Sequence, residues 1–315
     1  MTVTIHTGDC RDVLATLPTA SVDCIVTSPP YFGLRDYGKA NQIGLEPTPD
    51  AFVAEMVDVF REARRVLRDD GTLWLNIGDS YAVSGKGGNP ADSQHRKQAT
   101  NVGSLVSGRK RTDVLKPKDL IGIPWRVAFA LQADGWYLRQ DIIWSKPNPM
   151  PESVRDRCTK AHEYIFLLSK SERYYYDADA IAEPAKYAGH VVSLGDKSLS
   201  RGQARAAGRL PSGNGNAVSV TVSPTRNRRS VWTITTKTFG GAHFATFPPE
   251  LAELCTKAGC RIGGVVLDPF GGAGTTGLVA DRLGRNAILI ELNPDYAEMA
   301  RHRLAEDAPL LAEVV

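Results

Sequence analysis

Cysteine is scarce in this chain of 315 residues, and long apolar runs are absent. The cysteines are odd in number, contain no Cys-x-x-Cys pair, and favour reduced, buried thiols over disulfides or zinc: Cys10, Cys24, Cys158, Cys255 and Cys260. No apolar stretch approaches the roughly 20 residues that span a bilayer, and the first six residues lead into strand-like sequence without a signal segment. We therefore expect a cytoplasmic protein with no membrane association. No metal is expected, because no His/Cys/Asp cluster has ligand spacing.

Positive and negative side chains nearly balance, because the formal net charge is only +3. The charges are, however, unevenly distributed along the chain. Residues 86–118 contain eight Lys/Arg against two Asp, and residues 186–230 contain eight Lys/Arg against one Asp. The rest of the chain is net acidic. Two basic segments on an acidic body are typical of a protein that grips a phosphate backbone. Charge runs are equally common in solvated loops, so charge alone leaves both interpretations open.

Strand-like and helix-like segments alternate along most of the chain. Periodicity and end signals predict strands at 24–26, 72–77, 137–144, 163–168, 264–268 and 286–291, and helices at 52–67, 123–133, 248–258, 275–283 and 294–304. Residues 174–176 are expected to continue a hairpin. Residues 84–117 and 186–229 lack periodicity and read as long loops, the first of them mobile. This alternation predicts an α/β fold with a mostly parallel sheet and helices on both faces.

A glycine-rich turn stands between the strand at 264–268 and the helix at 275–283. Residues 272–277 match the pattern G-x-G-x-x-G, which permits close approach of the backbone to a ligand and is a weak signal by itself. Asp268 precedes the turn and would repel a pyrophosphate, but it suits a cofactor that carries an ammonium and a sulfonium. Glu291 ends the next strand, where its oxygens can accept both hydroxyls of a ribose. The pair favours S-adenosylmethionine over a nicotinamide dinucleotide, and a turn without any ligand is the remaining alternative.

The strand at 24–26 ends in Thr27-Ser28-Pro29-Pro30-Tyr31. An exocyclic amine on a base is a poor nucleophile, and two acceptors at its hydrogens, Ser28 Oγ and the Pro29 carbonyl, would activate it. Consecutive prolines, Pro29 and Pro30, hold that carbonyl in place, and Tyr31 offers a face on which a flipped base can stack. A strand-ending turn with a core tyrosine is the plainer interpretation. Because ligands bind at the carboxyl ends of strands, this turn and the glycine turn are expected to share one crevice.

Several further segments stand in a fixed order around these two turns. They are Gly8-Asp9-Cys10, Ser21-Val22-Asp23, Gly71-Thr72-Leu73-Trp74, the run from Ile143 to Pro151, His162-Glu163 and the run from His243 to Pro249. The ordered set resembles the β-type, permuted, site-specific DNA amino-methyltransferases over residues 1–180 and 230–305. The resemblance implies a Rossmann-like methyltransferase fold in permuted order. It also implies that the enzyme transfers a methyl group from S-adenosylmethionine to the amine of a base flipped out of double-stranded DNA.

The resemblance also assigns roles to particular residues. Asp9 and Cys10 are expected beside the adenine of the cofactor, Thr246 and Phe247 at its methionine end, and residues 146–150 around the target base. The complete cofactor set is Asp9, Cys10, His243, Phe244, Thr246, Phe247, Asp268, Phe270, Gly271, Gly272, Gly274, Thr275, Thr276, Glu291 and Asn293. The catalytic set is Ser28, Pro29, Pro30 and Tyr31.

A target-recognition insertion is expected at residues 184–230, between a catalytic part at 1–183 and a cofactor-binding part at 231–315. The basic loop at 84–118 is a second candidate clamp on DNA. The expected DNA-binding residues are Lys146, Asn148, Arg201, Arg205, Arg209, Arg226, Arg228 and Arg229, and most of the arginines are expected on phosphate. A cognate restriction endonuclease is a candidate partner, and the chain is expected to be a monomer or homodimer.

Ser28 bears on the identity of the base. In the family that the chain resembles, serine at this position mostly goes with the N4 amine of cytosine, and Asp or Asn mostly with the N6 amine of adenine. We therefore expect N4-cytosine methylation, with N6-adenine as the alternative. Carbon-5 methylation is disfavoured because no Pro-Cys dipeptide occurs. Methylation of RNA or of a protein glutamine, and a non-catalytic DNA-binding protein on a degenerate fold, are more distant alternatives.

Overall fold

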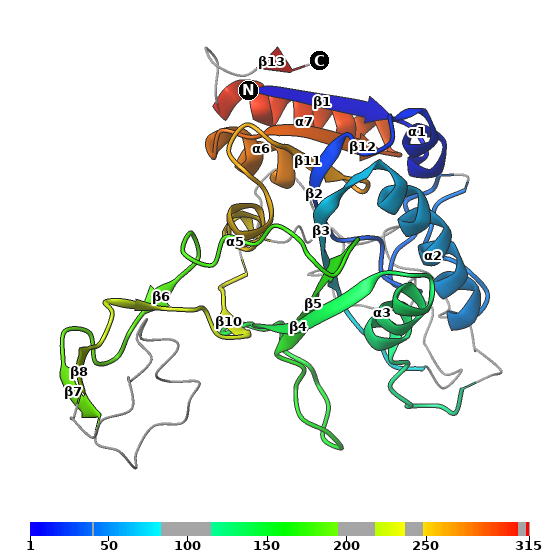
Figure 1. Ribbon diagram of the computed structural model, residues 1–315. Coiled ribbons are helices and arrows are strands. Elements are labelled where there is room, and N and C mark those ends of the chain that lie inside the picture. Colours follow the sequence, from blue (N-terminus) through cyan, green and yellow to red (C-terminus); the bar gives the residue numbers. More distant parts are fainter. Residues whose placement is uncertain (40, 83–114, 195–217, 237–247, 308–312, 315) are drawn as a thin grey trace. The chain divides into compact units, whose positions relative to one another are not determined.

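The computed structural model describes residues 1–39, 41–82, 115–194, 218–236, 248–307 and 313–314. The chain divides into two compact units, one formed by Met1–Tyr176 with Ser230–Val315 and the other by Asp177–Arg229 (Figure 1). The second unit therefore begins earlier than the insertion expected at residues 184–230. No helix in the described parts of the chain is long and apolar enough to cross a membrane.

The larger unit contains a nine-stranded sheet, counted over the described residues. Its order is β10-β4-β5-β3-β2-β11-β12-β1-β13, and every neighbouring pair is parallel except those of β5, which runs against β3 and β4. The strands are β1 (Thr2–Thr7), β2 (Val22–Thr27), β3 (Leu67–Ile77), β4 (Tyr137–Ser145), β5 (His162–Ser169), β10 (Val231–Thr233), β11 (Val265–Asp268), β12 (Asn286–Glu291) and β13 (Glu313–Val314).

The direction of chain progression changes between β2 and β11. From β2 the chain moves to β3 on one side, and from β11 it moves to β12 on the other, although the two strands are neighbours in the sheet. Open α/β sheets bind ligands outside the carboxyl ends of the strands at such a switch point. The fold thus places a ligand crevice where the two motif-bearing turns leave the sheet.

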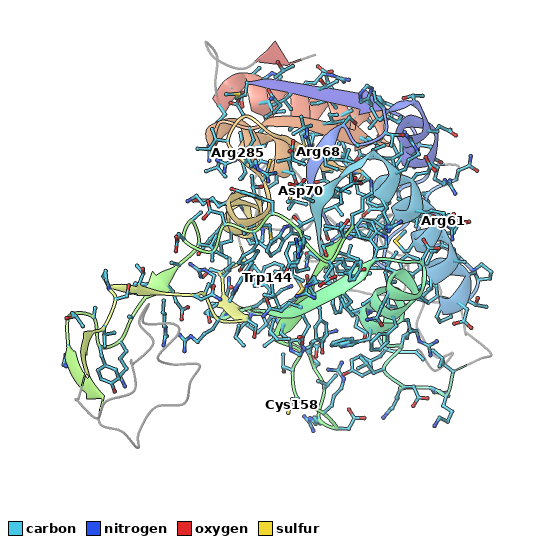
Figure 2. All side chains as sticks on the ribbon, viewed as in Figure 1. Arg61, Arg68, Asp70, Trp144, Cys158 and Arg285 are labelled. Atoms are coloured by element: carbon cyan, nitrogen blue, oxygen red, sulfur yellow. The ribbon has the colours of Figure 1, made fainter. Side chains whose placement is uncertain are left out.

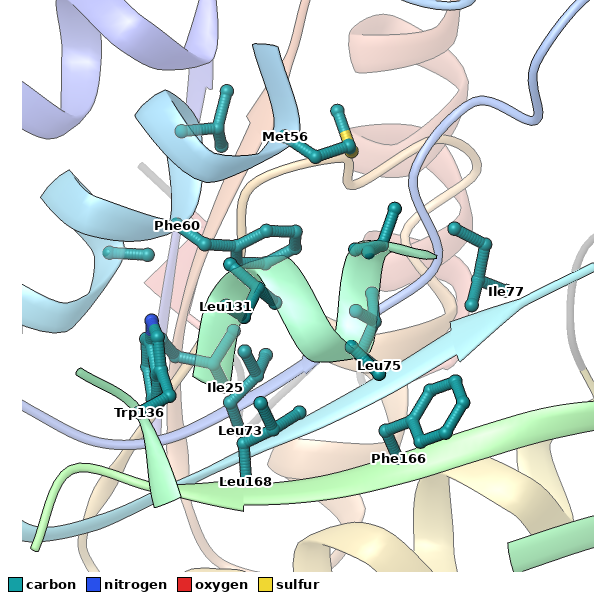
Figure 3. Packing of buried hydrophobic residues seen from close by; sticks show 14 of the residues in the cluster. Ile25, Met56, Phe60, Leu73, Leu75, Ile77, Leu131, Trp136, Phe166 and Leu168 are labelled. Atoms are coloured by element: carbon teal, nitrogen blue, oxygen red, sulfur yellow. The ribbon is translucent and has the colours of Figure 1, made fainter. Parts of the chain in front are cut away.

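Two helical layers cover the sheet, as the sequence predicts (Figure 1). One consists of α1 (Cys10–Thr16), α2 (Pro49–Val66) and α3 (Ile123–Ala133), and the other of α5 (Pro249–Gly259), α6 (Thr275–Arg282) and α7 (Pro294–Asp307). The core under the first layer joins Phe60 of α2, Leu131 of α3 and Leu73 of β3 (Figure 3). Burying one such side chain stabilises the fold by about 1.5–3 kcal/mol.

Helix α2 shows how local sequence determines an element. The Thr48 hydroxyl accepts a hydrogen bond from the amide of Ala51 (3.1 Å), and Pro49 occupies the first position, where a missing amide costs nothing. The buried residues recur every three or four positions and form one face: Phe52, Met56, Val59, Phe60, Ala63 and Val66. That face fixes the helix on the sheet.

Three sequence expectations need correction. Tyr174, Tyr175 and Tyr176 are not in a strand; Tyr176 instead stacks on Trp74, with ring centroids 6.3 Å apart. Strand β3 begins at Leu67, directly after α2, rather than at residue 72. Residues 186–229 are not wholly irregular, because the described ends pair as strands.

The unit Asp177–Arg229 is built on two short antiparallel pairs. Strand β6 (Glu183–Pro184) pairs with β9 (Thr225–Arg226), and β7 (Val191–Leu194) pairs with β8 (Val218–Thr221). Residues 195–217, and the basic loop expected over most of 84–118, lie outside the described residues.

Candidate active site

One cavity of about 800 Å³ receives both turns that the sequence singled out. Ser28, Pro29, Pro30 and Tyr31 line it on one side, and the loop from Pro269 to Ala273 lines it on the other. The volume lies within the roughly 300–1,000 Å³ usual for small-molecule sites. The structure thus brings together two segments that are about 240 positions apart in the chain.

A buried carboxylate joins the two turns. Asp268 Oδ1 accepts a hydrogen bond from the Thr27 hydroxyl (2.6 Å) and from the Phe270 amide (3.1 Å), while Oδ2 accepts from the Thr276 hydroxyl (2.6 Å). Asp268 is only 1% exposed, and burial raises its pKa to about 6. Asp268 is among the residues that line the cavity, and its carboxylate is engaged by three protein donors.

The glycine turn is shaped by contact with α7. Gly274 is the N-cap of α6 and has φ +77°, a left-handed conformation that glycine adopts without strain. A Cβ at Gly274 would also lie 2.9 Å from the Ala300 Cβ. Thr275 and Thr276 then begin α6 as buried residues. The turn therefore requires glycine at this position for both conformation and space.

Glu291 ends β12 at the rim of the cavity. Its Oε2 accepts from the Gly272 amide and its Oε1 from the Asn293 amide, both at 2.8 Å. Burial raises the pKa of Glu291. A carboxylate can accept about four hydrogen bonds in all, so acceptor capacity remains for a ligand hydroxyl. That Glu291 binds the ribose hydroxyls stays a prediction.

Tyr31 is held by side chains from two strands, β3 and β5. Its hydroxyl donates to Glu163 Oε2 (2.8 Å) and lies 3.4 Å from Asn76 Oδ1. Asn76 is near the end of β3, and Glu163 is near the start of the reversed strand β5, so both reach the same edge of the sheet. A Cβ on Gly78 would lie 2.4 Å from Tyr31 Cε2, so glycine there permits the close approach of the ring.

Lys146 and Asn148 are engaged within the protein, although both line the cavity. The ammonium of Lys146 pairs with Glu163 Oε1 and lies 4.2 Å from the ring centroid of Trp144. Asn148 makes a two-point contact with the Thr236 backbone, accepting from its amide (3.0 Å) and donating to its carbonyl (3.2 Å). The loop that follows Asn148 leads away from the sheet to Cys158, whereas Trp144 lies inside the larger unit (Figure 2).

Asp9 and Cys10 also line the cavity, at the start of α1. Asp9 is the N-cap of α1, and its side chain accepts from both the amide and the guanidinium of Arg11, which hold its pKa below the usual range. Cys10 is buried, and burial raises the pKa of its thiol to about 12. The thiol is thus neutral and offers an apolar contact rather than a nucleophile.

The expected DNA-binding arginines that are described belong to the smaller unit. Arg226 and Arg229 both donate through Nε to Glu183 Oε1, at 2.8 and 2.6 Å, and Arg228 Nε donates to the Ile181 carbonyl (2.8 Å).

Seven expected site residues lie outside the described residues: Arg201, Arg205, Arg209, His243, Phe244, Thr246 and Phe247. Among the described residues, no cluster of three or more His, Cys, Asp or Glu could hold a metal ion.

Asn76 and Glu163 were not among the predicted site residues. Asn76 is the one polar residue in the apolar stretch 73–77 of β3, and this is visible in the sequence. Glu163 was noted only as part of a family segment, because its place beside Tyr31 depends on the antiparallel pairing of β5. Tyr37 and Tyr296 were also missed; both line the cavity, and their rings meet edge to face at 6.4 Å.

Comparison with known proteins identifies the family. The profile of the N6/N4 DNA methylase family matches residues 22–302. The chain belongs to this DNA methylase family. It is 49% identical over 301 residues to the Type II methyltransferase M.SmaI of Serratia marcescens, covering 95% of this chain and 90% of the relative. It is 48% identical to M.Cfr9I of Citrobacter freundii, covering 96% and 87%.

Solved structures agree with this assignment. A putative DNA modification methylase of Thermus thermophilus, solved with S-adenosyl-L-methionine, is 27% identical, has a TM-score of 0.60 and is covered over 99% of both chains. The cytosine-N4-specific PvuII DNA methyltransferase, at 18% identity, shares the fold with a TM-score of 0.62 and coverage of 99% of this chain and 95% of that chain. The predicted Rossmann-like methyltransferase fold is thereby confirmed.

Membership of this family makes the protein a DNA amino-methyltransferase with S-adenosylmethionine as its cofactor. The cavity fits that cofactor on its own geometry. Glu291 retains acceptor capacity for a ligand hydroxyl, and Asp268 adds a buried carboxylate to the cavity lining. Gly272 lines the cavity with φ +51°, and a Cβ built there would meet only the Phe270 carbonyl oxygen, at 3.9 Å. Glycine adopts this left-handed conformation without strain.

Proposed function

We propose that this DNA methyltransferase modifies the N4 amine of cytosine. The observation that carries the proposal is Ser28 in the cavity lining. The Thr27–Asp268 hydrogen bond ties its turn to the glycine loop across neighbouring strands. A base amine seated at Ser28 then lies beside whatever the glycine loop holds. Ser28 is a neutral acceptor, the type that goes with cytosine N4 in the family that the sequence resembles.

The catalytic roles follow from the residues that line the cavity. S-adenosylmethionine supplies an electrophilic methyl group when it is bound. Ser28 Oγ and the Pro29 carbonyl accept the two hydrogens of the amine, which draws its lone pair out of conjugation with the ring and toward attack. Pro30 stiffens the turn. Tyr31 lines the cavity and offers its ring to a base that has left the helix.

We propose the cofactor roles in the same terms. Glu291 binds the ribose hydroxyls, and Gly271 and Gly272 let the backbone approach the ligand. Asp268 sets the charge beneath the glycine loop and fixes its conformation through Phe270. The remaining predicted residues that are described either line the cavity, as do Asp9, Cys10, Phe270, Thr275 and Asn293, or build the start of α6, as do Gly274 and Thr276.

The smaller unit, Asp177–Arg229, is proposed as the target-recognition part. Arg226 and Arg229 are exposed and both pair with Glu183. When DNA binds, we propose that they leave Glu183 and contact phosphates instead. Lys146 and Asn148 are proposed to contribute at the base pocket. Because the relatives are named Type II methyltransferases, a restriction endonuclease of the same specificity is the proposed cellular partner, and we expect a monomer or homodimer.

The test follows labelled methyl groups from the cofactor into duplex DNA of mixed sequence. Ser28→Ala should reduce single-turnover transfer by about 10²-fold, the usual cost of one preorganised group at the reacting atom. Ser21→Ala removes an exposed hydroxyl that bonds only the Pro18 carbonyl, and it should transfer at the wild-type rate. Undiminished transfer by Ser28→Ala would refute the role given to the turn. Failure of the wild type to label DNA would refute the function itself.

A further inference from the structure

Met150 is an apolar residue that is exposed to solvent at the rim of the active-site cavity. It is 85% exposed and still belongs to the cavity lining. Among the large apolar residues in the described parts of the chain, none is more exposed. A single exposed apolar side chain is ordinary on a protein surface, but one at the rim of a site meets whatever enters that site.

The segment that carries Met150 is a braced projection. Residues 146–161, the β4–β5 loop, lead away from the sheet (Figure 2). The Lys146 amide donates to the Ala161 carbonyl (2.8 Å) and closes the base of the loop. Farther out, the Arg157 guanidinium lies 4.0 Å from the ring centroid of Tyr81. The loop is thus supported at its base and along its length before any ligand binds.

The backbone on both sides of Met150 is restricted. Pro149 and Pro151 each fix one dihedral angle, and a residue that precedes a proline is biased toward extended conformations. Asn148 is held by its two-point contact with the Thr236 backbone, at 3.0 and 3.2 Å. The backbone is therefore set in advance, whereas the unbranched methionine side chain adapts its shape to a partner.

Printed contacts place the base of the β4–β5 loop beside the catalytic turn. The Tyr31 hydroxyl donates to Glu163 Oε2 (2.8 Å), and Glu163 Oε1 pairs with the Lys146 ammonium. Tyr31 is the residue proposed to take the flipped base. Duplex DNA that delivers a base to this turn therefore also meets the loop that carries Met150.

Base flipping creates a need for an apolar group at this place. A base that leaves the duplex gives up its stacking and leaves its partner base unpaired. Proteins that distort DNA in this way frequently insert an apolar wedge between base steps, and methionine is one of the residues used. Such a wedge is apolar, exposed before DNA binds, and carried on a supported backbone. Met150 meets each of these requirements.

We propose that Met150 is a wedge that enters the DNA stack where the target base has left it. The side chain contacts the partner base that stays behind and so stabilises the flipped state, and no bond is made or broken. The β4–β5 loop contains four Lys/Arg against two acidic residues, and this excess of positive charge suits an approach to phosphates. The inference rests on the proposed function, because only base flipping opens the gap.

The experiment measures single-turnover methyl transfer on two forms of one duplex, built on the site that the wild type is first found to methylate. The target base is paired in one form and faces an abasic position in the other. On the paired form, Met150→Ala should be at least about 10-fold slower than wild type, equivalent to about 1.4 kcal/mol of lost apolar contact. On the second form the two rates should converge, because an unpaired base leaves the stack at little cost.

Two variants and one binding measurement serve as controls. Met150→Leu keeps the apolar volume and should react at the wild-type rate on both duplexes. Ile262→Ala removes a side chain that is 79% exposed and precedes β11, at the other end of that strand from Asp268; it should also react at the wild-type rate. S-adenosylhomocysteine should stabilise Met150→Ala as much as wild type, which shows that the cofactor site is intact.

Equal slowing of Met150→Ala on both duplexes would overturn the wedge, because Met150 would then shape the base pocket instead of filling the gap. Full speed of this variant on the paired duplex would overturn it as well. Both results leave the methyltransferase assignment in place. A wild type that places no methyl group on any base amine would instead remove the proposed function, and the wedge with it, so the two failures are distinguishable.

Discussion

Replacing Asp268 by Asn tests whether the buried charge beneath the glycine loop is kept for function at a cost in stability. The amide preserves the shape of the carboxylate. Its oxygen can still accept from Thr27 and from the Phe270 amide, while its NH₂ group donates to Thr276, whose hydroxyl then turns to the Val26 carbonyl at 3.3 Å. The substitution therefore removes the charge while leaving the hydrogen bonds in place.

The size of the effect follows from the pKa. Burial raises the pKa of Asp268 from its ordinary 3.8 to about 6, which corresponds to about 3 kcal/mol against the charged form in the folded state. A raised carboxyl pKa contributes stability that is present below pH 3.8 and is lost as the pH rises through 6. Asp268→Asn should therefore unfold with a free energy up to about 3 kcal/mol greater than the wild type at pH 7.5, and the difference should vanish near pH 4.

Urea unfolding of both proteins at a series of pH values measures this difference, and Asp69→Asn, at a carboxylate that is 90% exposed, serves as the control. The same Asp268→Asn variant should bind S-adenosylhomocysteine more weakly, because the negative charge beneath the cofactor is lost. A variant that is less stable than wild type by the same amount at every pH would refute the reasoning, because the Asp268 carboxylate would then stabilise the fold.

Three further predictions concern neighbouring parts of the molecule. Gly78→Ala should push the Tyr31 ring out of place, since the new Cβ would lie 2.4 Å from it, and should lower kcat at least 10-fold while S-adenosylhomocysteine still raises the melting temperature; an unchanged kcat would contradict the packing. Glu291→Gln should weaken S-adenosylhomocysteine binding about 10-fold in calorimetry, in line with about 1.5 kcal/mol for a charged hydrogen bond, and equal affinity would show that the ribose lies elsewhere. Glu183→Gln should release its two arginines, so that DNA affinity rises and its dependence on salt steepens; affinity that falls would place the carboxylate itself on the DNA.

The sheet and its helices could be predicted because their signals are local. The helix at Ile123–Ala133 and the strand at Asn286–Glu291 have the predicted bounds, since glycine, aspartate and proline mark their ends and apolar spacing marks their faces. Tyr174–Tyr176 shows the limit of such reasoning. Three aromatic residues favour a strand by propensity, but contacts such as the stacking of Tyr176 on Trp74 hold them in an irregular segment.

The site could be predicted only in part. The turn at Ser28 and the glycine loop carry recognisable motifs, whereas the segment that contributes Glu163 carries none. Ser28 and Gly272 stand in recognisable turns, and the rule for carboxyl ends of strands brings them together. Glu163 comes to the cavity from the beginning of a strand, which happens only because β5 runs against its neighbours. That pairing is a long-range property of the sheet and leaves no mark within the Glu163 segment.

The acceptor atom of the methyl group tests the central claim most directly. Duplex DNA lacking prior methylation is incubated with the protein and S-adenosylmethionine, then digested to nucleosides and weighed by mass spectrometry. We predict N4-methylcytosine in the wild-type reaction and almost none with Ser28→Ala. N6-methyladenine in place of N4-methylcytosine, or methylation that persists without the Ser28 hydroxyl, would contradict the account.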